Sequence, residues 1–446
     1  MSNFIVFIFL LVFLAGCSDN PTQTTINPPS VSSYVPALDD MVMYEVNLRA
    51  FSQQGTIEGL IQRLDSVKAL GVNVLWIMPI YPVGILKGIN SPYCIRNYTA
   101  VADEYGSIAD MKRLTDSAHA KGMAVILDWV ANHTSWDNPW ILNTSWYTKD
   151  ANGAIIHPSG TNWQDVADLN YDSKELRDTM IASMRWWIDS VHIDGFRCDY
   201  ADGVPADFWK SAITKLDSTT QKSLLFLAEG TRSDHFASGF DLIFSWNYYS
   251  SLKSVFSGAN ASSITNTHIQ EYANVPAGKH RLRFTTNHDE SAWDNSPVVL
   301  FKGLNGALAA SVITIFMDGV PFLYNGQEVG RASKTPFFSK SPIQWNDNPQ
   351  MLSAYKNIMH VFSNTTAARK GINTYYSNAN AVCFKKSFNT EEILVVVNVR
   401  NQQTAIPLAA ELKNTQWFDA FDHSPLTLDS SLTLQPYQYR LLKSNQ

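Results

Sequence analysis

The stretch KELRDTMIASMRWWIDSVHIDGFRCD, residues 174–199, decides the fold, because it joins one helical pattern to one short apolar run. The helical pattern covers 174–190, and the run His192–Arg197 predicts a strand that ends just before Asp199. The same unit recurs along the chain from about residue 40 to residue 327. Units of this kind predict parallel strands that are covered by helices.

Eight apolar runs in this part of the chain are expected to form strands. They are Val42–Val46, Val72–Met78, Ala124–Asp128, His192–Arg197, Leu224–Glu229, Leu242–Phe244, Leu282–Thr285 and Phe322–Tyr324. The helices expected between them are Ile57–Leu70, Ile108–Lys121, Lys174–Ser190, Pro205–Leu216 and Leu300–Met317. Eight strands alternating with helices predict an α/β fold, a (β/α)₈ TIM barrel. An open doubly wound sheet is the alternative, but no Gly-rich dinucleotide motif follows any strand.

Two stretches interrupt the alternation. Residues 133–171 are aromatic and lack a regular pattern, so we interpret them as a short loop domain inserted after the third strand. After about residue 371 the pattern changes to strands such as Ile393–Asn398, which predicts a C-terminal antiparallel β-sandwich domain. The barrel is therefore expected at 40–370 and the β-domain at 371–446.

The N-terminus resembles a bacterial lipoprotein signal. An apolar run ends in Leu14-Ala15-Gly16-Cys17 and is too short for an ordinary membrane-spanning helix. We expect residues 1–17 to be the signal peptide, Cys17 to be lipidated, and residues 18–39 to be a flexible tether. A plain secretory signal or a retained anchor is the alternative. The expected location is the bacterial envelope, with the lipid on Cys17 anchoring the protein at the outer membrane, on its periplasmic or surface face.

Composition narrows the classes of partner. The formal charge is −6 and no long basic run is present, so no nucleic-acid partner is expected. The chain has 13 Trp, several of them in loop-like contexts, and aromatic rings stack on the apolar faces of sugars. Three cysteines besides Cys17 cannot all pair within the chain, so no disulfide framework is implied.

Acidic residues follow several of the expected strands, at the barrel end where active sites lie. Cleavage of a glycosidic bond needs a carboxylic acid that protonates the leaving oxygen and a carboxylate that attacks or stabilises the sugar cation. Negative neighbours can keep one acid protonated near neutral pH, while a nearby Arg can keep another ionised. The candidate side chains are Asp128, Arg197, Asp199, Glu229 and Asp289.

Four segments carry these residues and resemble the signature segments of the α-amylase family, glycoside hydrolase family 13. They are Asp128-Trp-Val-Ala-Asn132-His133, Gly195-Phe-Arg197-Cys-Asp199, Leu227-Ala-Glu229-Gly and Phe284-Thr-Thr-Asn-His288-Asp289. They occur in the family's order and at strand ends. Three further segments are similar to family segments: Gly71 to Ile80, Ala167 to Asn170 and Tyr324 to Glu328.

The resemblance implies a role for each matching residue. Asp199 would be the nucleophile, Glu229 the proton donor, and Asp289 the residue that grips sugar hydroxyls. Asp128 would support Arg197, which would orient Asp199. The residues implied to bind the substrate are Tyr93, His133, Arg197 and His288.

The resemblance also implies that no cofactor is required for the chemistry, and that Asn132 and Asp168 could hold a structural calcium ion, since this cation prefers oxygen ligands. One departure is informative. Many endo-acting members carry a His four residues after the nucleophile, where this chain has Gly203. The sequence therefore does not predict which residues bind the sugar on the leaving-group side of the site.

The predicted function is a retaining α-glucan hydrolase that cleaves α-1,4-glucosidic bonds in starch, glycogen or maltooligosaccharides. An α-glucosidase, a transglycosylase or a sucrose- or trehalose-active enzyme of the same family is the alternative, because these share the catalytic residues. A non-catalytic glucan-binding lipoprotein would be expected to lack one of the essential acids, and all three are present.

Overall fold

The computed structural model describes residue 1, residues 34–220 and residues 222–444. The predicted lipidation site Cys17, nearly all of the predicted signal peptide and most of the predicted tether lie outside the described residues.

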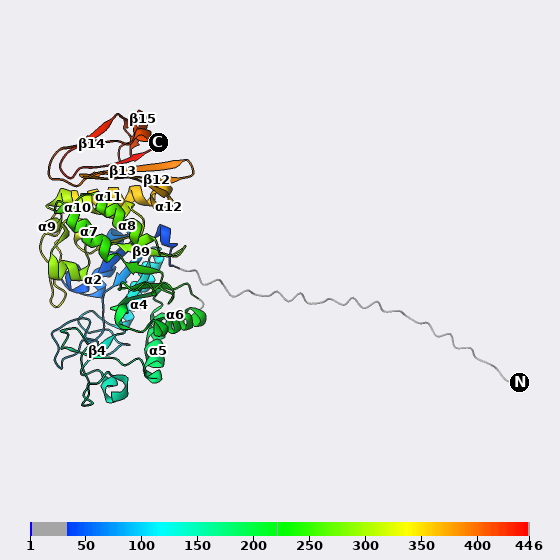
Figure 1. Cartoon of the computed structure of the whole chain (residues 1–446). Coiled ribbons are helices and arrows are strands. Elements are labelled where there is room, and N and C mark those ends of the chain that lie inside the picture. The colour runs from blue at the N-terminus through cyan, green and yellow to red at the C-terminus, as the bar shows by residue number, and fades with distance from the viewer. Residues whose placement is uncertain (2–33, 221, 445–446) are drawn as a thin grey trace. The chain divides into compact units, whose positions relative to one another are not determined.

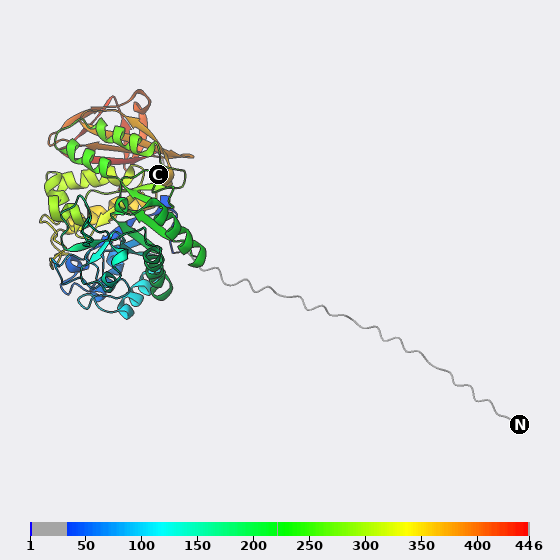
Figure 2. The same cartoon turned by 60° about the horizontal axis from the view of Figure 1, so that its bottom comes forward.

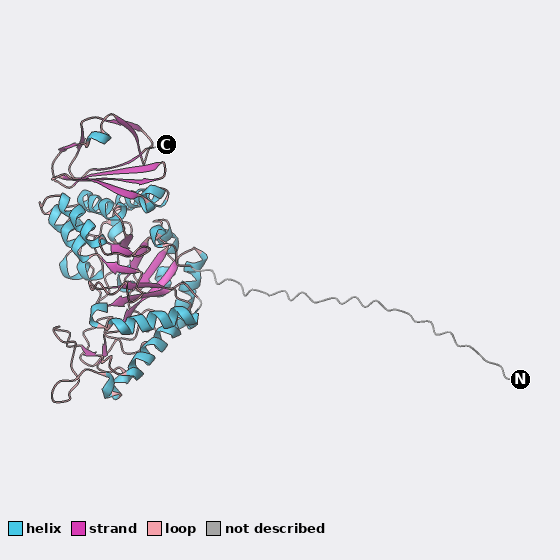
Figure 3. Cartoon of the chain, turned by 45° about the vertical axis from the view of Figure 1, so that its right-hand side comes forward, coloured by secondary structure: helices cyan, strands magenta, loops and turns pink. Residues whose placement is uncertain are grey.

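Eight parallel strands close into a barrel, which confirms the predicted TIM-barrel fold (Figure 3). Around the barrel the strand order is β1-β10-β9-β8-β7-β6-β3-β2. The strands are β1 (Met43–Val46), β2 (Val74–Ile77), β3 (Ala124–Val130), β6 (Gly195–Asp199), β7 (Leu225–Ala228), β8 (Leu242–Phe244), β9 (His280–Arg283) and β10 (Val320–Tyr324).

The barrel strands are apolar on both faces because both faces are buried. On β2, Val74 and Trp76 belong to the core inside the barrel, while Leu75 and Ile77 pack towards the surrounding helices. Since side chains alternate along a strand, a barrel covered by helices needs near-continuous apolar runs.

Helices surround the barrel (Figure 1). They are α1 (Leu48–Phe51), α2 (Ile57–Ile61), α3 (Leu64–Lys68), α4 (Ile108–Ala120), α5 (Lys174–Val191), α6 (Ala206–Thr220), α7 (Trp246–Phe256), α8 (Ser262–Tyr272), α9 (Pro297–Leu300), α10 (Leu304–Phe316), α11 (Pro349–Ser363) and α12 (Thr366–Lys370). Among the described residues, no helix has both the length and the apolar character needed to cross a membrane.

The chain leaves the barrel after β3 and forms a small antiparallel pair, β4 (His133–Ser135) with β5 (Val166–Asp168). The stretch between these strands contains two short 3-10 turns and long loops, in keeping with the inserted loop domain expected there. The register pairs His133 with Asp168, so the first residue of this loop domain lies beside a residue near its end.

The C-terminal part forms two antiparallel sheets, which confirms the predicted β-domain. The larger sheet has the order β11-β12-β13-β18-β15-β16, and the smaller sheet pairs β14 with β17. The strands are β11 (Ile372–Tyr376), β12 (Ala381–Phe388), β13 (Glu391–Asn398), β14 (Thr404–Pro407), β15 (Thr415–Asp419), β16 (Pro425–Leu428), β17 (Ser431–Leu434) and β18 (Tyr439–Lys443). One face of the larger sheet shares a core with the smaller sheet, and the other packs on helices that include α10 and α12 (Figure 2).

Candidate active site

A cleft of about 560 Å³ lies at the carboxyl ends of the barrel strands. Asp199 ends β6, Glu229 follows β7, and Asp289 follows β9, so three strands direct an acid into the same space. Side chains from the inserted loop domain, including His133 and Trp163, also line the cleft. The site is therefore a polar cleft with aromatic walls, as a sugar-binding site requires.

Arg197 is the centre of the charged groups in the cleft. Its Nη1 donates hydrogen bonds to Asp128 at 2.7 Å and to Asp199 at 2.9 Å. Its Nη2 lies 2.9 Å from a carboxylate oxygen of Glu229, as an ion pair whose angle is poor for a hydrogen bond. The Arg197 side chain is fully buried, so one cation is shared among three carboxylates away from water.

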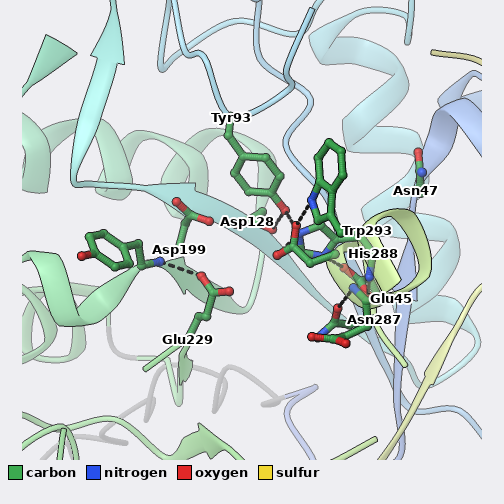
Figure 4. Close-up of polar contacts among 12 residues, drawn as sticks. Glu45, Asn47, Tyr93, Asp128, Asp199, Glu229, Asn287, His288 and Trp293 are labelled. Atoms are coloured by element: carbon green, nitrogen blue, oxygen red, sulfur yellow. Dashed lines mark hydrogen bonds and ion pairs between the residues drawn. The ribbon is translucent and has the colours of Figure 1, made fainter. Parts of the chain in front are cut away.

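Asp199 and Glu229 occupy neighbouring positions on adjacent strands (Figure 4). β6 and β7 pair Cys198 with Ala228, and the backbone N–H of Glu229 donates to the carbonyl oxygen of Cys198 at 3.0 Å. Adjacent strands run about 4.8 Å apart. Both carboxyl groups also lie within 2.9 Å of the Arg197 guanidinium, so they are near neighbours, as the pair of acids in a retaining glycosidase must be.

The proton affinities of these two acids differ. Burial raises the pKa of Glu229 to about 7, Arg197 opposes this shift, and the carboxylates Asp199 and Asp289 add to it. Burial raises the pKa of Asp199 to about 6, again against the opposing charge of Arg197. Glu229 therefore holds a proton more tightly than its neighbour, which is the distribution that an acid and a nucleophile need.

The third acid, Asp289, is held ionised. Burial alone would raise its pKa, but His288, Arg197 and the indole N–H of Trp293 hold the pKa of Asp289 below its usual value. His288 Nε2 lies 3.3 Å from one Asp289 oxygen, and Trp293 Nε1 donates to the other at 3.2 Å. Asp289 is thus an anion beside Asp199 and Glu229.

Tyr93 and His133 also reach the cleft, as expected. The Tyr93 ring stacks on His288 with a centroid distance of 5.3 Å, and its hydroxyl donates to Asp128 at 3.1 Å. Burial lowers the pKa of His133 to about 4, so this imidazole is neutral at neutral pH. The structure therefore brings Asp128, Arg197, Asp199, Glu229, His288, Asp289, Tyr93 and His133 together.

The sequence analysis missed Trp293, which lines this cleft, and Glu45, which lies behind it and contacts His288. Glu45 lies within the apolar run of β1 and contacts His288 through its carboxylate. A charged residue inside such a run was the available signal. Trp293 lies one turn after Asp289, in a π-helical turn at Glu290–Asp294, and 63 % of its surface is exposed. The only sequence signal for Trp293 was its spacing of four residues from Asp289.

Asn132 and Asp168, the expected calcium ligands, lie on neighbouring segments beside the cleft. The carbonyl oxygen of Asn132 accepts a hydrogen bond from Leu169 N at 3.1 Å. Burial raises the pKa of Asp168, which a bound cation would offset. Among the described residues, however, no three His, Cys, Asp or Glu side chains are grouped as metal ligands. The side chains thus fit calcium only in part, since the ion takes six to eight oxygens.

Comparison with known proteins agrees with this geometry. The model of the α-amylase catalytic domain matches residues 22–155, and that of the maltogenic-amylase C-terminal domain matches residues 374–441. The α-amylase MalA of Haloarcula japonica is 24 % identical over 84 % of this chain and 58 % of that protein. α-Amylase 3 of Dictyoglomus thermophilum is 27 % identical over 72 % of this chain. The chain covers 70 % of the length of that relative.

A solved structure extends the likeness to most of the chain. The α-amylase from Lactobacillus plantarum superposes with a TM-score of 0.83 at 26 % identity. The match covers 91 % of this chain and 99 % of that one, so it includes both the barrel and the C-terminal β-domain.

Proposed function

Because this chain belongs to the α-amylase family of glycoside hydrolases, we propose that it hydrolyses α-1,4-glucosidic bonds in starch, glycogen or maltooligosaccharides, with retention of configuration. The observation that carries this proposal is the placement of Asp199 and Glu229 on adjacent strands around Arg197. Double displacement requires two carboxyl groups about 5 Å apart, and acids at neighbouring positions on adjacent strands can meet this requirement.

In the first step, the Asp199 carboxylate attacks the anomeric carbon while Glu229 donates its proton to the leaving glycosidic oxygen. The bond between sugar and leaving group breaks, and a glycosyl ester forms on Asp199. In the second step, ionised Glu229 removes a proton from water, which displaces Asp199 from the sugar. Two inversions at the same carbon return the α configuration.

The remaining groups hold the reacting sugar. Asp289 is an anion and accepts hydrogen bonds from sugar hydroxyls, while Tyr93 offers a ring face to the sugar. His133 is neutral and can both donate and accept. Arg197 keeps Asp199 oriented, and its contact with Asp128 fixes the guanidinium in turn.

The side of the leaving group is aromatic. Tyr200 N donates to Glu229 at 2.8 Å, and the Tyr200 ring packs edge-on against Trp163 with a centroid distance of 5.1 Å. Such rings bind sugars by stacking, which supports the binding of a further glucosyl unit here in place of the missing His at Gly203.

Enzymes of this family need no cofactor for the chemistry. A structural calcium ion stays a proposal, with Asn132 and Asp168 as the side chains that would hold it. Their oxygens would join the inserted loop domain to the barrel, and the remaining ligands would be backbone carbonyls or water.

A product profile over time tests the proposed function. Soluble starch and maltoheptaose are expected to yield shorter maltooligosaccharides, whereas pullulan and sucrose are expected to be poor substrates. Asp199→Asn should abolish turnover and retain glucan binding. Products from sucrose alone, saccharides longer than maltoheptaose as the main products, or an active Asp199→Asn variant would contradict the proposal.

A further inference from the structure

Glu45 is a fully buried carboxylate to which the proposed mechanism gives no role. It comes from β1, and both of its oxygens are directed at one residue, His288 (Figure 4). Oε1 lies 2.6 Å from His288 Nδ1, and Oε2 accepts the backbone N–H of His288 at 3.2 Å. Burying a carboxylate costs free energy unless the group is paired, so the position of Glu45 needs an explanation.

The other nitrogen of His288 faces the cleft. Nε2 lies 2.7 Å from the Tyr93 hydroxyl and 3.3 Å from Asp289. The Asp289 carboxylate can only accept, so Nε2 carries a hydrogen, which the Tyr93 oxygen can also accept while its own hydrogen goes to Asp128. Nδ1 faces a Glu45 oxygen. With Glu45 ionised, both ring nitrogens act as donors, which only an imidazolium can do.

The surrounding charges favour this cation. Burial alone would lower the pKa of His288, but Asp289 and Glu45 outweigh it and raise the pKa well above the usual value. Burial also raises the pKa of Glu45, but the opposing charges of His288 and Arg197 lower it, and its Oε2 accepts the backbone N–H of His288. The titratable groups that face this pair from the elements around it are Glu45, Tyr93, Asp128, Arg197, Asp289 and Tyr324.

We propose that Glu45 is a positioning residue that holds His288 as an imidazolium, which in turn keeps Asp289 ionised and aimed into the cleft. This inference rests on the proposed function, because Asp289 matters only if a sugar binds there. It assigns the two protons of His288 to stated atoms, Nδ1–H towards Glu45 and Nε2–H towards Tyr93 and Asp289. Glu229, which His288 does not contact, keeps its own proton for the leaving group.

The test is Glu45→Gln, which preserves size and removes the charge. Without the carboxylate, the pKa of His288 falls, so the cation is lost as pH rises and is retained at low pH. We expect kcat/KM on maltoheptaose to stay near that of the wild type at pH 5.5. At pH 8, kcat/KM should fall about tenfold relative to the wild type. This is the loss expected when the pKa of His288 drops to about one unit below that pH. A purely structural role would lower activity equally at both pH values.

Glu271→Gln is the matched control. Glu271 is also a buried carboxylate and accepts a hydrogen bond from Arg283, but it does not line the cleft. Its variant should change activity, if at all, by the same factor at every pH. A ratio of Glu45→Gln to wild-type activity that does not change with pH would overturn the inference while leaving the proposed function intact.

A spectroscopic measurement keeps the inference falsifiable if Glu45→Gln does not fold. In ¹⁵N-histidine-labelled wild type at pH 8, the His288 signals, assigned by their loss in His288→Asn, should show two protonated ring nitrogens. One unprotonated nitrogen in the wild type would overturn the inference. This readout needs no substrate, whereas an inactive wild type would overturn the proposed function.

Discussion

Glu229 and Asp199 share one guanidinium, yet burial and their acidic neighbours give them different proton affinities. Activity needs Asp199 ionised, so it rises as pH increases through about 6, and it needs Glu229 protonated, so it falls as pH increases through about 7. Because the two acids titrate together, the profile reports the pair. We predict a narrow bell-shaped dependence of kcat/KM, with its maximum between these values. A plateau that extends above pH 9 would contradict the assignment of Glu229 as the acid.

At the scale of single residues, the sequence predicted which catalytic side chains meet, but it did not predict every residue that contacts them. Asp199, Glu229 and Asp289 follow apolar runs, and the ends of parallel barrel strands share one rim. Glu45 contacts His288 of the same site but lies inside its apolar run, where its neighbours conceal it. Proton affinities could not be predicted either, because they depend on burial and on charges brought from distant strands.

Among the elements, β6 has a strict requirement at its first residue, Gly195. Its φ is 151°, and a Cβ there would lie 2.0 Å from the carbonyl oxygen of Leu225 on β7. Gly195→Ala should therefore separate the two strands that carry Asp199 and Glu229. We predict a loss of more than about 3 kcal/mol in the free energy of unfolding, or no folded protein.

Gly160→Ala is the control for this prediction. Gly160 also has a positive φ, 76°, but nothing lies within 4 Å of an added Cβ. Only the left-handed backbone should cost stability there, about 1–2 kcal/mol. Urea unfolding of both variants measures the difference, and equal losses would show that contact with Leu225 is unimportant.

The elements also show where local patterns fail. The run Leu300–Met317 predicts one helix, but the structure has α9 and α10, which are separated at Lys302 and Gly303, with φ of 67° and 112°. Helical residues need φ near −63°, so the chain must turn there. The predicted helix Ile57–Leu70 is divided near Arg63, whose guanidinium lies 4.4 Å from the Trp345 ring centroid. Such a contact comes from tertiary packing and leaves no local signal.

For the whole molecule, the sequence predicted the barrel and the antiparallel β-domain because the hydrophobic period changes between them. The structure adds how they pack, since one face of the larger sheet shares a core with α10 and the other with the smaller sheet. The long loops between β4 and β5 have no period, so only the structure could place Trp163 at the cleft.

The lipid anchor on Cys17 also belongs to this scale, and it remains a proposal. Cys17→Ala should move the full-length protein, expressed in a bacterium, from the detergent phase to the aqueous phase on phase partition. Starch hydrolysis per molecule should not change, because the catalytic groups all lie beyond residue 40. Thr24→Ala serves as the control and should stay in the detergent phase. Equal partition of the wild type and Cys17→Ala would contradict lipidation.

The most direct measurement is mass spectrometry of Glu229→Gln after incubation with α-maltosyl fluoride. Fluoride leaves without a proton donor, so Asp199 can still attack, whereas the ester should persist because no base activates water. We predict one added maltosyl group, located on the peptide that contains Asp199. An adduct on another residue, or no adduct while fluoride is released, would contradict double displacement by Asp199 and Glu229.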